Sequence, residues 1–252
     1  KRNKKLCYVN YLPIWNFILF VLLPPNTLLG PITGGSNYLK KPFFNYFLRK
    51  FIIKFLSRIG SLILKLRKNH ILFSTDLLRE YFPLNKNYYF NFVLEDLKLG
   101  NSNIKKKFDI VFYLRSHRNK NKFMQIKLIK ELSKNYKVLT VGDLSNIPNV
   151  KDLGKIDRKK LLNYLKITKY AFISAENLYS FFCIDCLKSG TYIFHNNFKI
   201  YNPNIKKRSI KADYNNFDKL LKIINRQLKK KYITIKDKKI VNFRSFDYYF
   251  RI

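Results

Sequence analysis

Two acidic residues and a helix start lie close together in residues 169–196, and their chemistry suits a ligand with hydroxyl and phosphate groups. Glu176 follows a short apolar run, and Asp185 lies within the next predicted helix. A carboxylate accepts hydrogen bonds from hydroxyl groups. The free N–H groups of a helix's first turn, here at Ser180 and Phe181, can face a phosphate. This stretch therefore predicts a site for a hydroxylated and phosphorylated ligand.

The elements that position these acids follow the order strand, loop, helix, strand. Residues 170–174 are rich in strand-forming side chains, Gly190 is a helix-stop signal, and residues 191–195 form a second apolar run. In open α/β sheets, ligands bind outside the carboxyl ends of the strands. Glu176 follows directly after such an end, so we expect it at the ligand-binding edge of a sheet.

Cations follow an earlier predicted strand in the same way. Arg115 ends the strand expected over residues 109–115, and Lys120 and Lys122 lie in the loop that follows. Arg can hold a diphosphate through two parallel hydrogen bonds, and Lys can do so as a point charge. The alternative is a solvated basic loop, which is an ordinary feature in a chain with 51 Lys and Arg residues.

The second half of the chain alternates between strands and helices. We expect strands over residues 109–115, 137–141, 150–153, 170–174 and 191–195, and helices over residues 120–134, 158–166 and 213–230. Asp157 is the expected N-cap of the helix over residues 158–166. This alternation predicts an α/β fold with a doubly wound parallel sheet.

The first hundred residues also predict an α/β unit, although fewer than four strands can be recognised in them. A strand over residues 27–29 is expected to lead into the run Gly30-Pro-Ile-Thr-Gly-Gly35. Gly34 and Gly35 could allow the backbone to cradle a phosphate, or the run could be a tight turn that needs a positive φ. A short strand over residues 71–75 precedes Asp76, which is the expected N-cap of residues 77–82.

A turn-rich segment at residues 99–103 is the expected linker between two domains. We therefore predict a partial N-terminal Rossmann-like domain in residues 1–103 and a C-terminal Rossmann-like domain in residues 104–235. Residues 236–252 form a tail, which could be a helix that returns to the first domain.

The formal net charge of +36 would attract nucleic acid, anionic lipid or phosphorylated substrates. Heavy use of Lys, Asn, Ile, Phe and Tyr is also typical of an AT-rich genome, which accounts for part of this charge. Residues 1–75 contain no acid, and a helix expected over residues 43–68 carries Lys50, Lys54, Arg58 and Lys65 within an arc of about 80°. Such a helix could lie on anionic lipid, or it could be a core helix with a solvated basic stripe.

Location is suggested by cysteine usage and by the length of the apolar runs. The chain has three cysteines, and Cys183 and Cys186 are expected to be buried thiols rather than zinc or redox ligands. This usage is typical of a reducing, cytoplasmic setting. Residues 14–23 are apolar except for Asn16, but this run is too short to cross a bilayer, which needs about 20 residues.

Taken in order, these motifs resemble the donor-binding half of the GT-B-fold glycosyltransferases of group 1, a retaining, sugar-nucleotide-dependent family. The run Asp185-Cys-Leu-Lys-Ser-Gly190 matches the second half of the family's acidic motif, and Leu114-Arg115 stands where the family has Gly-Arg. Eight residues separate Glu176 from Asp185, where the family usually has seven between two glutamates. The resemblance spans residues 108–196 and extends loosely over residues 20–100.

The resemblance implies a GT-B fold of two Rossmann-like doubly wound parallel-sheet domains, the first of them incomplete in this chain. It implies that Glu176 is catalytic and binds the donor sugar, while Asp185 accepts hydrogen bonds from ribose hydroxyls. Arg115 and Lys120 would hold the leaving diphosphate.

Further donor contacts are implied for the residues around these groups. Gly142, in the Val-Gly pair that ends the second strand, would lie near the nucleotide. The helix start at Ser180 and Phe181 would face the diphosphate, and Gly34 and Gly35 would contribute from the first domain.

The implied reaction is transfer of a sugar from a nucleotide sugar to a cell-surface polysaccharide or lipid-linked acceptor, with an anionic membrane surface as a further partner. No cofactor or metal is expected, since cations can stabilise the leaving group and the sequence has no Asp-x-Asp motif. One alternative is a basic nucleic-acid-binding protein, but the chain lacks clear RRM, KH, zinc-finger and helix-turn-helix patterns, so nucleic acid is not the expected partner. Another alternative is a catalytically inactive relative.

Overall fold

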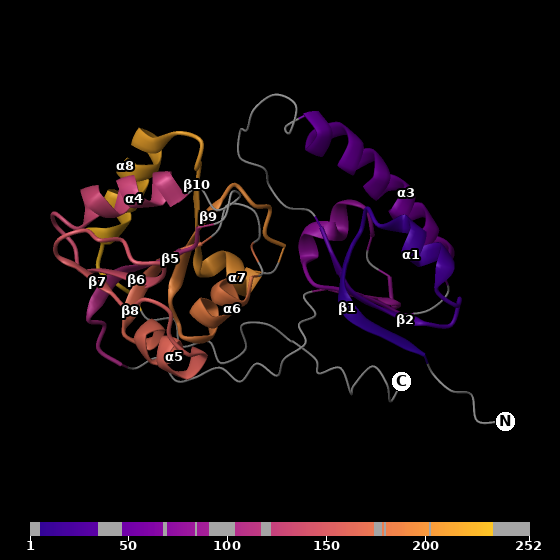
Figure 1. Cartoon of the computed structure of the whole chain (residues 1–252), viewed down its shortest axis with the longest axis horizontal. Coiled ribbons are helices and arrows are strands. Elements are labelled where there is room, and N and C mark those ends of the chain that lie inside the picture. Colours follow the sequence, from indigo (N-terminus) through magenta and orange to yellow (C-terminus); the bar gives the residue numbers. More distant parts are fainter. Residues whose placement is uncertain are drawn as a thin grey trace. The chain divides into compact units, whose positions relative to one another are not determined.

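Two separate parallel sheets organise the chain in the computed structural model (Figure 1). The structure describes residues 6–34, 47–67, 70–83, 85–90, 104–116, 122–173, 178, 180–201 and 203–233. Among them, residues 6–90 and 199–201 form a first compact unit, and residues 104–198 and 203–233 form a second. The expected linker and the expected tail lie outside the described residues. The predicted α/β class with two parallel sheets is confirmed.

The first unit contains a four-stranded parallel sheet in the order β1-β2-β3-β4. Its strands are β1 (Cys7–Pro13), β2 (Leu28–Thr33), β3 (Ile71–Phe73) and β4 (Tyr88–Tyr89). Its helices are α1 (Phe17–Leu22), α3 (Ile53–Leu66), a π-helical turn η1 (Leu48–Ile52) that leads into α3, and a 3₁₀ helix η2 (Asp76–Glu80). The expected long basic helix is therefore present over its described part.

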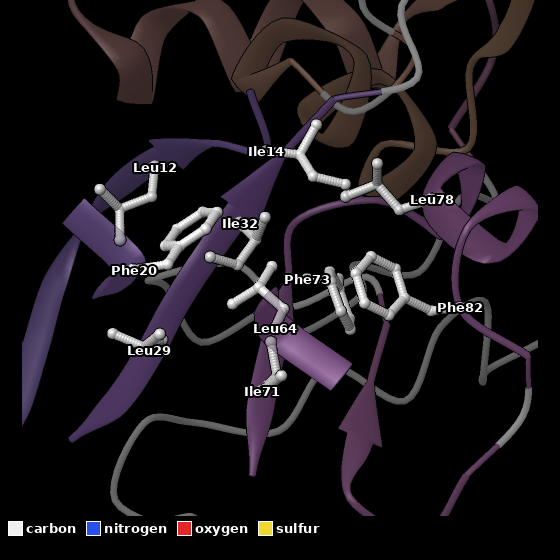
Figure 2. Close-up of a cluster of buried hydrophobic side chains, with 10 residues drawn as sticks. All are labelled: Leu12, Ile14, Phe20, Leu29, Ile32, Leu64, Ile71, Phe73, Leu78 and Phe82. Atoms are coloured by element: carbon white, nitrogen blue, oxygen red, sulfur yellow. The ribbon is translucent and has the colours of Figure 1, made fainter. Parts of the chain in front are cut away.

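Among the described residues of this unit, ten buried side chains form a core cluster (Figure 2). The strands contribute Leu12, Leu29, Ile32, Ile71 and Phe73, and the remaining five are Ile14, Phe20, Leu64, Leu78 and Phe82. The rings of Phe73 and Phe82 lie 4.6 Å apart between centroids. Helices α1 and α3 contribute Phe20 and Leu64 to this core, so both helices pack against the sheet.

Two local predictions in the first unit were wrong. The strand expected to end at residue 29 continues through Gly30 to Thr33. Glycine is required there because a Cβ on Gly30 would lie 2.5 Å from the Leu72 carbonyl oxygen of the neighbouring strand. The N-cap of η2 is Thr75, whose Oγ1 accepts a hydrogen bond from the Leu77 amide at 3.1 Å, and not Asp76.

The second unit contains a six-stranded parallel sheet in the order β10-β9-β8-β5-β6-β7. Its strands are β5 (Phe108–Leu114), β6 (Val138–Gly142), β7 (Val150–Asp152), β8 (Thr168–Phe172), β9 (Tyr192–Asn196) and β10 (Ser209–Ala212). Its helices are α4 (Lys122–Leu132), α5 (Arg158–Lys166), α6 (Phe181–Lys188), α7 (Pro203–Lys207) and α8 (Phe217–Leu228).

Most of the elements expected in this unit are confirmed within a few residues. Asp157 caps α5 as expected, since its side chain accepts a hydrogen bond from the Lys160 amide at 2.9 Å. The last helix begins later than the expected residue 213, because Asn216 provides its N-cap. The short elements α7 and β10 were not foreseen.

The order of strands creates a switch point between β5 and β8. From β5 the chain winds outward through β6 and β7, and from β8 it winds the other way through β9 and β10. Helices α4 and α8 pack together on one side of the sheet, and α5 and α6 on the other (Figure 1). In such sheets the crevice outside the carboxyl ends of the two strands at the switch point is the usual ligand site.

Candidate functional site

A hydrogen-bonded trio lies at the carboxyl ends of β5 and β6. Lys122, the first residue of α4, donates from Nζ to Ser116 Oγ at 2.8 Å and to Asp143 Oδ2 at 3.1 Å. Ser116 Oγ donates to the same Asp143 oxygen at 2.6 Å. The Ser116 hydrogen bond, followed by Lys122, lowers the pKa of the Asp143 carboxyl. The ammonium group of Lys122 is thereby held at the ligand-binding edge of the sheet.

Gly142 allows the backbone at the end of β6 to lie very close to the backbone at the end of β5. Its φ is +101°, and a Cβ there would lie 2.2 Å from the Leu114 carbonyl oxygen. The next residue, Asp143, donates its amide to that same carbonyl at 3.0 Å. No side chain larger than hydrogen fits at this position without moving the backbone, so glycine is what keeps Asp143 beside the end of β5.

The start of α6 lies next to the end of β5. Ser180 is the N-cap of α6, and its Oγ accepts a hydrogen bond from the Cys183 amide at 3.3 Å. The ring of Phe182, in the first turn, lies 5.1 Å from the ring of Tyr113 near the end of β5. The guanidinium of Arg115 lies 5.9 Å from the centre of that same Tyr113 ring. Arg115 and the helix start thus approach one point at the switch of the sheet.

Asp185 forms an ion pair with Arg158, the first residue of α5. Arg158 donates from Nε to Oδ2 at 2.9 Å and from Nη2 to Oδ1 at 2.6 Å. The Asp185 side chain is 2% exposed, whereas that of Arg158 is 38% exposed. The guanidinium also lies 6.0 Å from the ring of Phe181, the exposed first residue of α6. The Asp185 carboxylate is therefore buried and already has a cationic partner.

Of the four remaining expected site residues, Gly34 lies in the described part of the chain, in the first unit. Glu176, Lys120 and Gly35 are outside the described residues, and their roles stay predictions. Gly34 follows β2, where a Cβ would lie 2.8 Å from Ile14 Cγ2 and 2.9 Å from Leu78 Cδ2. Close packing by itself thus accounts for a glycine at that position.

The two cysteines of α6 are buried and free, as expected for structural thiols. Burial raises the pKa of both Cys183 and Cys186, with a further contribution from nearby Asp185. Thiols in this state are poor nucleophiles and poor metal ligands. Within the described ranges, no three His, Cys, Asp or Glu side chains gather as a metal ion would require.

Sequence reasoning missed three residues of this edge. Ser116 could have been found, because it directly follows Arg115 at a predicted strand end. Tyr113 gave no signal beyond being part of the strand. Arg158 could not have been paired with its acid, because 51 Lys and Arg residues offer too many candidates.

No protein-family model and no curated protein matches the chain, whereas solved structures do. Sucrose-phosphate synthase from Thermosynechococcus elongatus is similar at 15% identity with a TM-score of 0.52, covering 86% of this chain and 63% of that one. A glycosyltransferase from Rickettsia africae ESF-5 has 15% identity and a TM-score of 0.49, covering 89% of this chain and 68% of that one. An alpha-glucosyltransferase in complex with UDP and a 13-mer DNA has 10% identity and a TM-score of 0.48, covering 94% and 73%.

The likeness to sucrose-phosphate synthase establishes the fold. The chain has the GT-B fold, with two parallel α/β units that each carry their own core. It spans 63% of the length of that synthase.

Proposed function

We propose that this chain is a glycosyltransferase that moves a sugar from a nucleotide-sugar donor to a cell-surface polysaccharide or lipid-linked acceptor, working on the cytoplasmic face of a membrane. One observation carries the proposal: Arg115 and the start of α6 lie beside the same ring, Tyr113, near the carboxyl end of β5, and Lys122 is held at the neighbouring ends of β5 and β6. The GT-B fold supports it. The net charge of +36 favours an anionic donor and a negatively charged working surface.

In this mechanism the bond between the sugar's anomeric carbon and the diphosphate oxygen breaks, and its electron pair stays on the diphosphate. A cation-like sugar then forms a new bond to the acceptor hydroxyl, whose proton passes to a base. Arg115, Lys122 and the N–H groups of the first turn of α6 stabilise the negative charge that develops on the leaving group. Lys120 would add to this charge. These groups do the work of a metal ion, so we propose that no metal cofactor takes part.

The two acids have different proposed roles. Glu176 contacts the donor sugar and is the proposed catalytic carboxylate. Asp185 accepts hydrogen bonds from the ribose with lone pairs that Arg158 leaves available, because a carboxylate offers about four acceptor sites. Arg158 then fixes the direction of the carboxylate. Gly142 gives the nucleotide close access to the backbone, and the contribution of Gly34 and Gly35 would come from the first unit.

A thermal-unfolding screen against UDP, GDP, CDP, ADP and their sugars tests the proposal. A nucleotide present at a hundredfold excess over its Kd stabilises the folded protein by about 2.7 kcal/mol. For a chain of this size that raises Tm by about 5–10 °C. The shift should disappear in Arg115→Ala and shrink in Lys122→Ala.

Lys130→Ala is the matched control, because Lys130 is an exposed lysine in the last turn of the same helix α4. It should keep the full shift. Glu176→Gln should keep nucleotide binding but lose sugar transfer to an added glycan acceptor. If no nucleotide stabilises the wild-type chain, the proposal is wrong, and an inactive relative or a nucleic-acid-binding protein becomes the better interpretation.

A further inference from the structure

Helix α3 presents apolar side chains to solvent on the face opposite the core. Phe55, Leu62 and Leu66 are 62%, 61% and 83% exposed. At 100° per residue these three side chains fall within an arc of about 40°. The buried residues of α3, including Gly60 and Leu64, lie on the other side of the helix. A core helix with only a solvated basic stripe would not expose such large apolar side chains, since its outward face would be polar.

Basic side chains run beside this apolar stripe. Lys54, Arg58 and Lys65 are exposed and also fall within an arc of about 40°, centred about 80° from the apolar one. Residues 1–75 contain no acidic residue that would neutralise them. The helix therefore offers two parallel stripes, one apolar and one cationic, on its outward side.

A second helix, α1, also exposes apolar side chains, and it is tied to α3 by hydrogen bonds. Arg67, directly after α3, donates from Nη1 to the Phe20 carbonyl at 2.7 Å and to the Leu23 carbonyl at 3.1 Å. It thereby satisfies carbonyl groups at the end of α1, whose residues Val21 and Leu22 are themselves exposed. The two helices also pack side by side (Figure 1). They form a firm surface rather than a loose segment.

We propose that the outward side of α3, made of Lys54, Phe55, Arg58, Leu62, Lys65 and Leu66, docks on an anionic lipid bilayer. Apolar side chains enter the boundary between head groups and acyl chains, while the cations contact lipid phosphates. Nucleic acid is a poorer fit, because phosphate contacts would leave the apolar stripe in water. Single exposed apolar residues are normal on soluble proteins, but a continuous stripe beside unopposed cations is not.

This mode of binding is peripheral. In the part of the chain that the structure describes, no helix has the length and apolarity to cross a membrane. The inference specifies which surface of the protein binds the membrane and which class of lipid it binds. It rests on the proposed function only for the reason why the protein would be at a membrane. Vesicle binding and nucleotide binding are separate measurements, so either can fail while the other holds.

Co-sedimentation of the whole chain with vesicles tests the surface. Wild-type protein should bind vesicles containing one third phosphatidylglycerol much better than pure phosphatidylcholine, and binding should weaken from about 0.1 M to about 1 M salt. Each cation near an anionic surface contributes about fivefold in partition coefficient, so K54Q/R58Q/K65Q should bind about 100-fold more weakly. F55S/L62S/L66S should lose at least about 100-fold through lost apolar burial.

The matched control is K219Q/K222Q/R226Q, which removes three exposed cations from α8 in the second unit. It leaves the same net charge as the basic variant of α3 but should bind within about threefold of wild type, because charges that do not contact the bilayer are screened by salt. The charge-conserving variant K54R/K65R should also bind like wild type. Matching far-UV circular dichroism and unfolding curves show that each variant is folded.

Three results would overturn the inference. The first is full vesicle binding by the folded variant F55S/L62S/L66S, which would mean that the apolar stripe is not used. The second is an equal loss in the α3 and α8 charge variants, which would reduce the effect to net charge. The third is wild-type protein that binds a DNA or RNA duplex but neither kind of vesicle.

Discussion

The ion pair between α5 and α6 should respond very differently to removal of its two partners. Asp185 is 2% exposed and Arg158 is 38% exposed. Without Arg158, a buried carboxylate loses its cationic partner, which costs several kcal/mol. Without the carboxylate charge, a partly exposed guanidinium can turn toward water, and such exposed charges contribute little. The cost of breaking the pair therefore depends on which side is removed.

We expect Arg158→Ala to lower the free energy of unfolding by about 3 kcal/mol, the low end for a buried pair because the arginine is partly solvated. Asp185→Asn should cost about 1 kcal/mol, since the amide oxygen still accepts a hydrogen bond. In a chain of this size these values correspond to Tm decreases of about 6–12 °C and about 2–4 °C. The double variant R158A/D185N should recover most of the loss, because it no longer buries an unpaired charge.

Differential scanning calorimetry and urea unfolding of the wild type and the three variants measure these quantities. Arg226→Ala, which removes an exposed arginine of α8, is the control and should change Tm little. The reasoning fails if Asp185→Asn destabilises as much as Arg158→Ala. It also fails if the double variant is no more stable than Arg158→Ala alone, because the unpaired carboxylate would then not be the cause.

Three further outcomes can be measured by urea unfolding. Gly142→Ala should cost at least about 3 kcal/mol, because its Cβ would meet the Leu114 carbonyl at 2.2 Å. Burial, aided by Lys211, lowers the pKa of His195 from 6.5 to about 4, so the unfolded chain binds the proton more readily. The free energy of unfolding should therefore be highest above pH 6.5 and should fall by about 3 kcal/mol as the pH is lowered to 4. His195→Asn should abolish this loss. Arg67→Met should cost about 2 kcal/mol, since it removes charged hydrogen bonds to the carbonyls of α1.

Local chemistry decided what could be predicted from the sequence. The helix Arg158–Lys166 has the bounds that were expected, because Asp157 provides an N-cap within three residues of the amide that it binds. Gly190 was expected to end α6, and it lies just past the helix with a φ of +70°. The alternation of such elements was enough to indicate the parallel sheet of the second unit and to place Arg115 at a strand's carboxyl end.

Contacts between distant parts of the chain could not be predicted in this way. Gly30 looked like a turn residue, but its role is to let β2 approach the Leu72 carbonyl, which lies more than forty positions further along. The pairing of Arg158 with Asp185 crosses 27 positions and depends on α5 packing against α6. Thr75 and Asp76 are both acceptable N-caps by type, and only the path of the chain after β3 decides between them.

The placement of the basic residues carries information that their number does not. A coding bias would raise the count of Lys over the whole chain. Helix α8 shows the ordinary result, with Lys219, Lys222 and Arg226 exposed while the large apolar side chains of the helix are buried or half-buried. On α3 the cations stand beside Phe55 and Leu62, which remain in water although burying such a side chain contributes about 1.5–3 kcal/mol. A bias toward AT-rich codons would add Phe and Lys, but it would not align them in adjacent stripes. A bilayer surface uses both stripes at once, and this is why the position of these cations, rather than the net charge, points to a membrane.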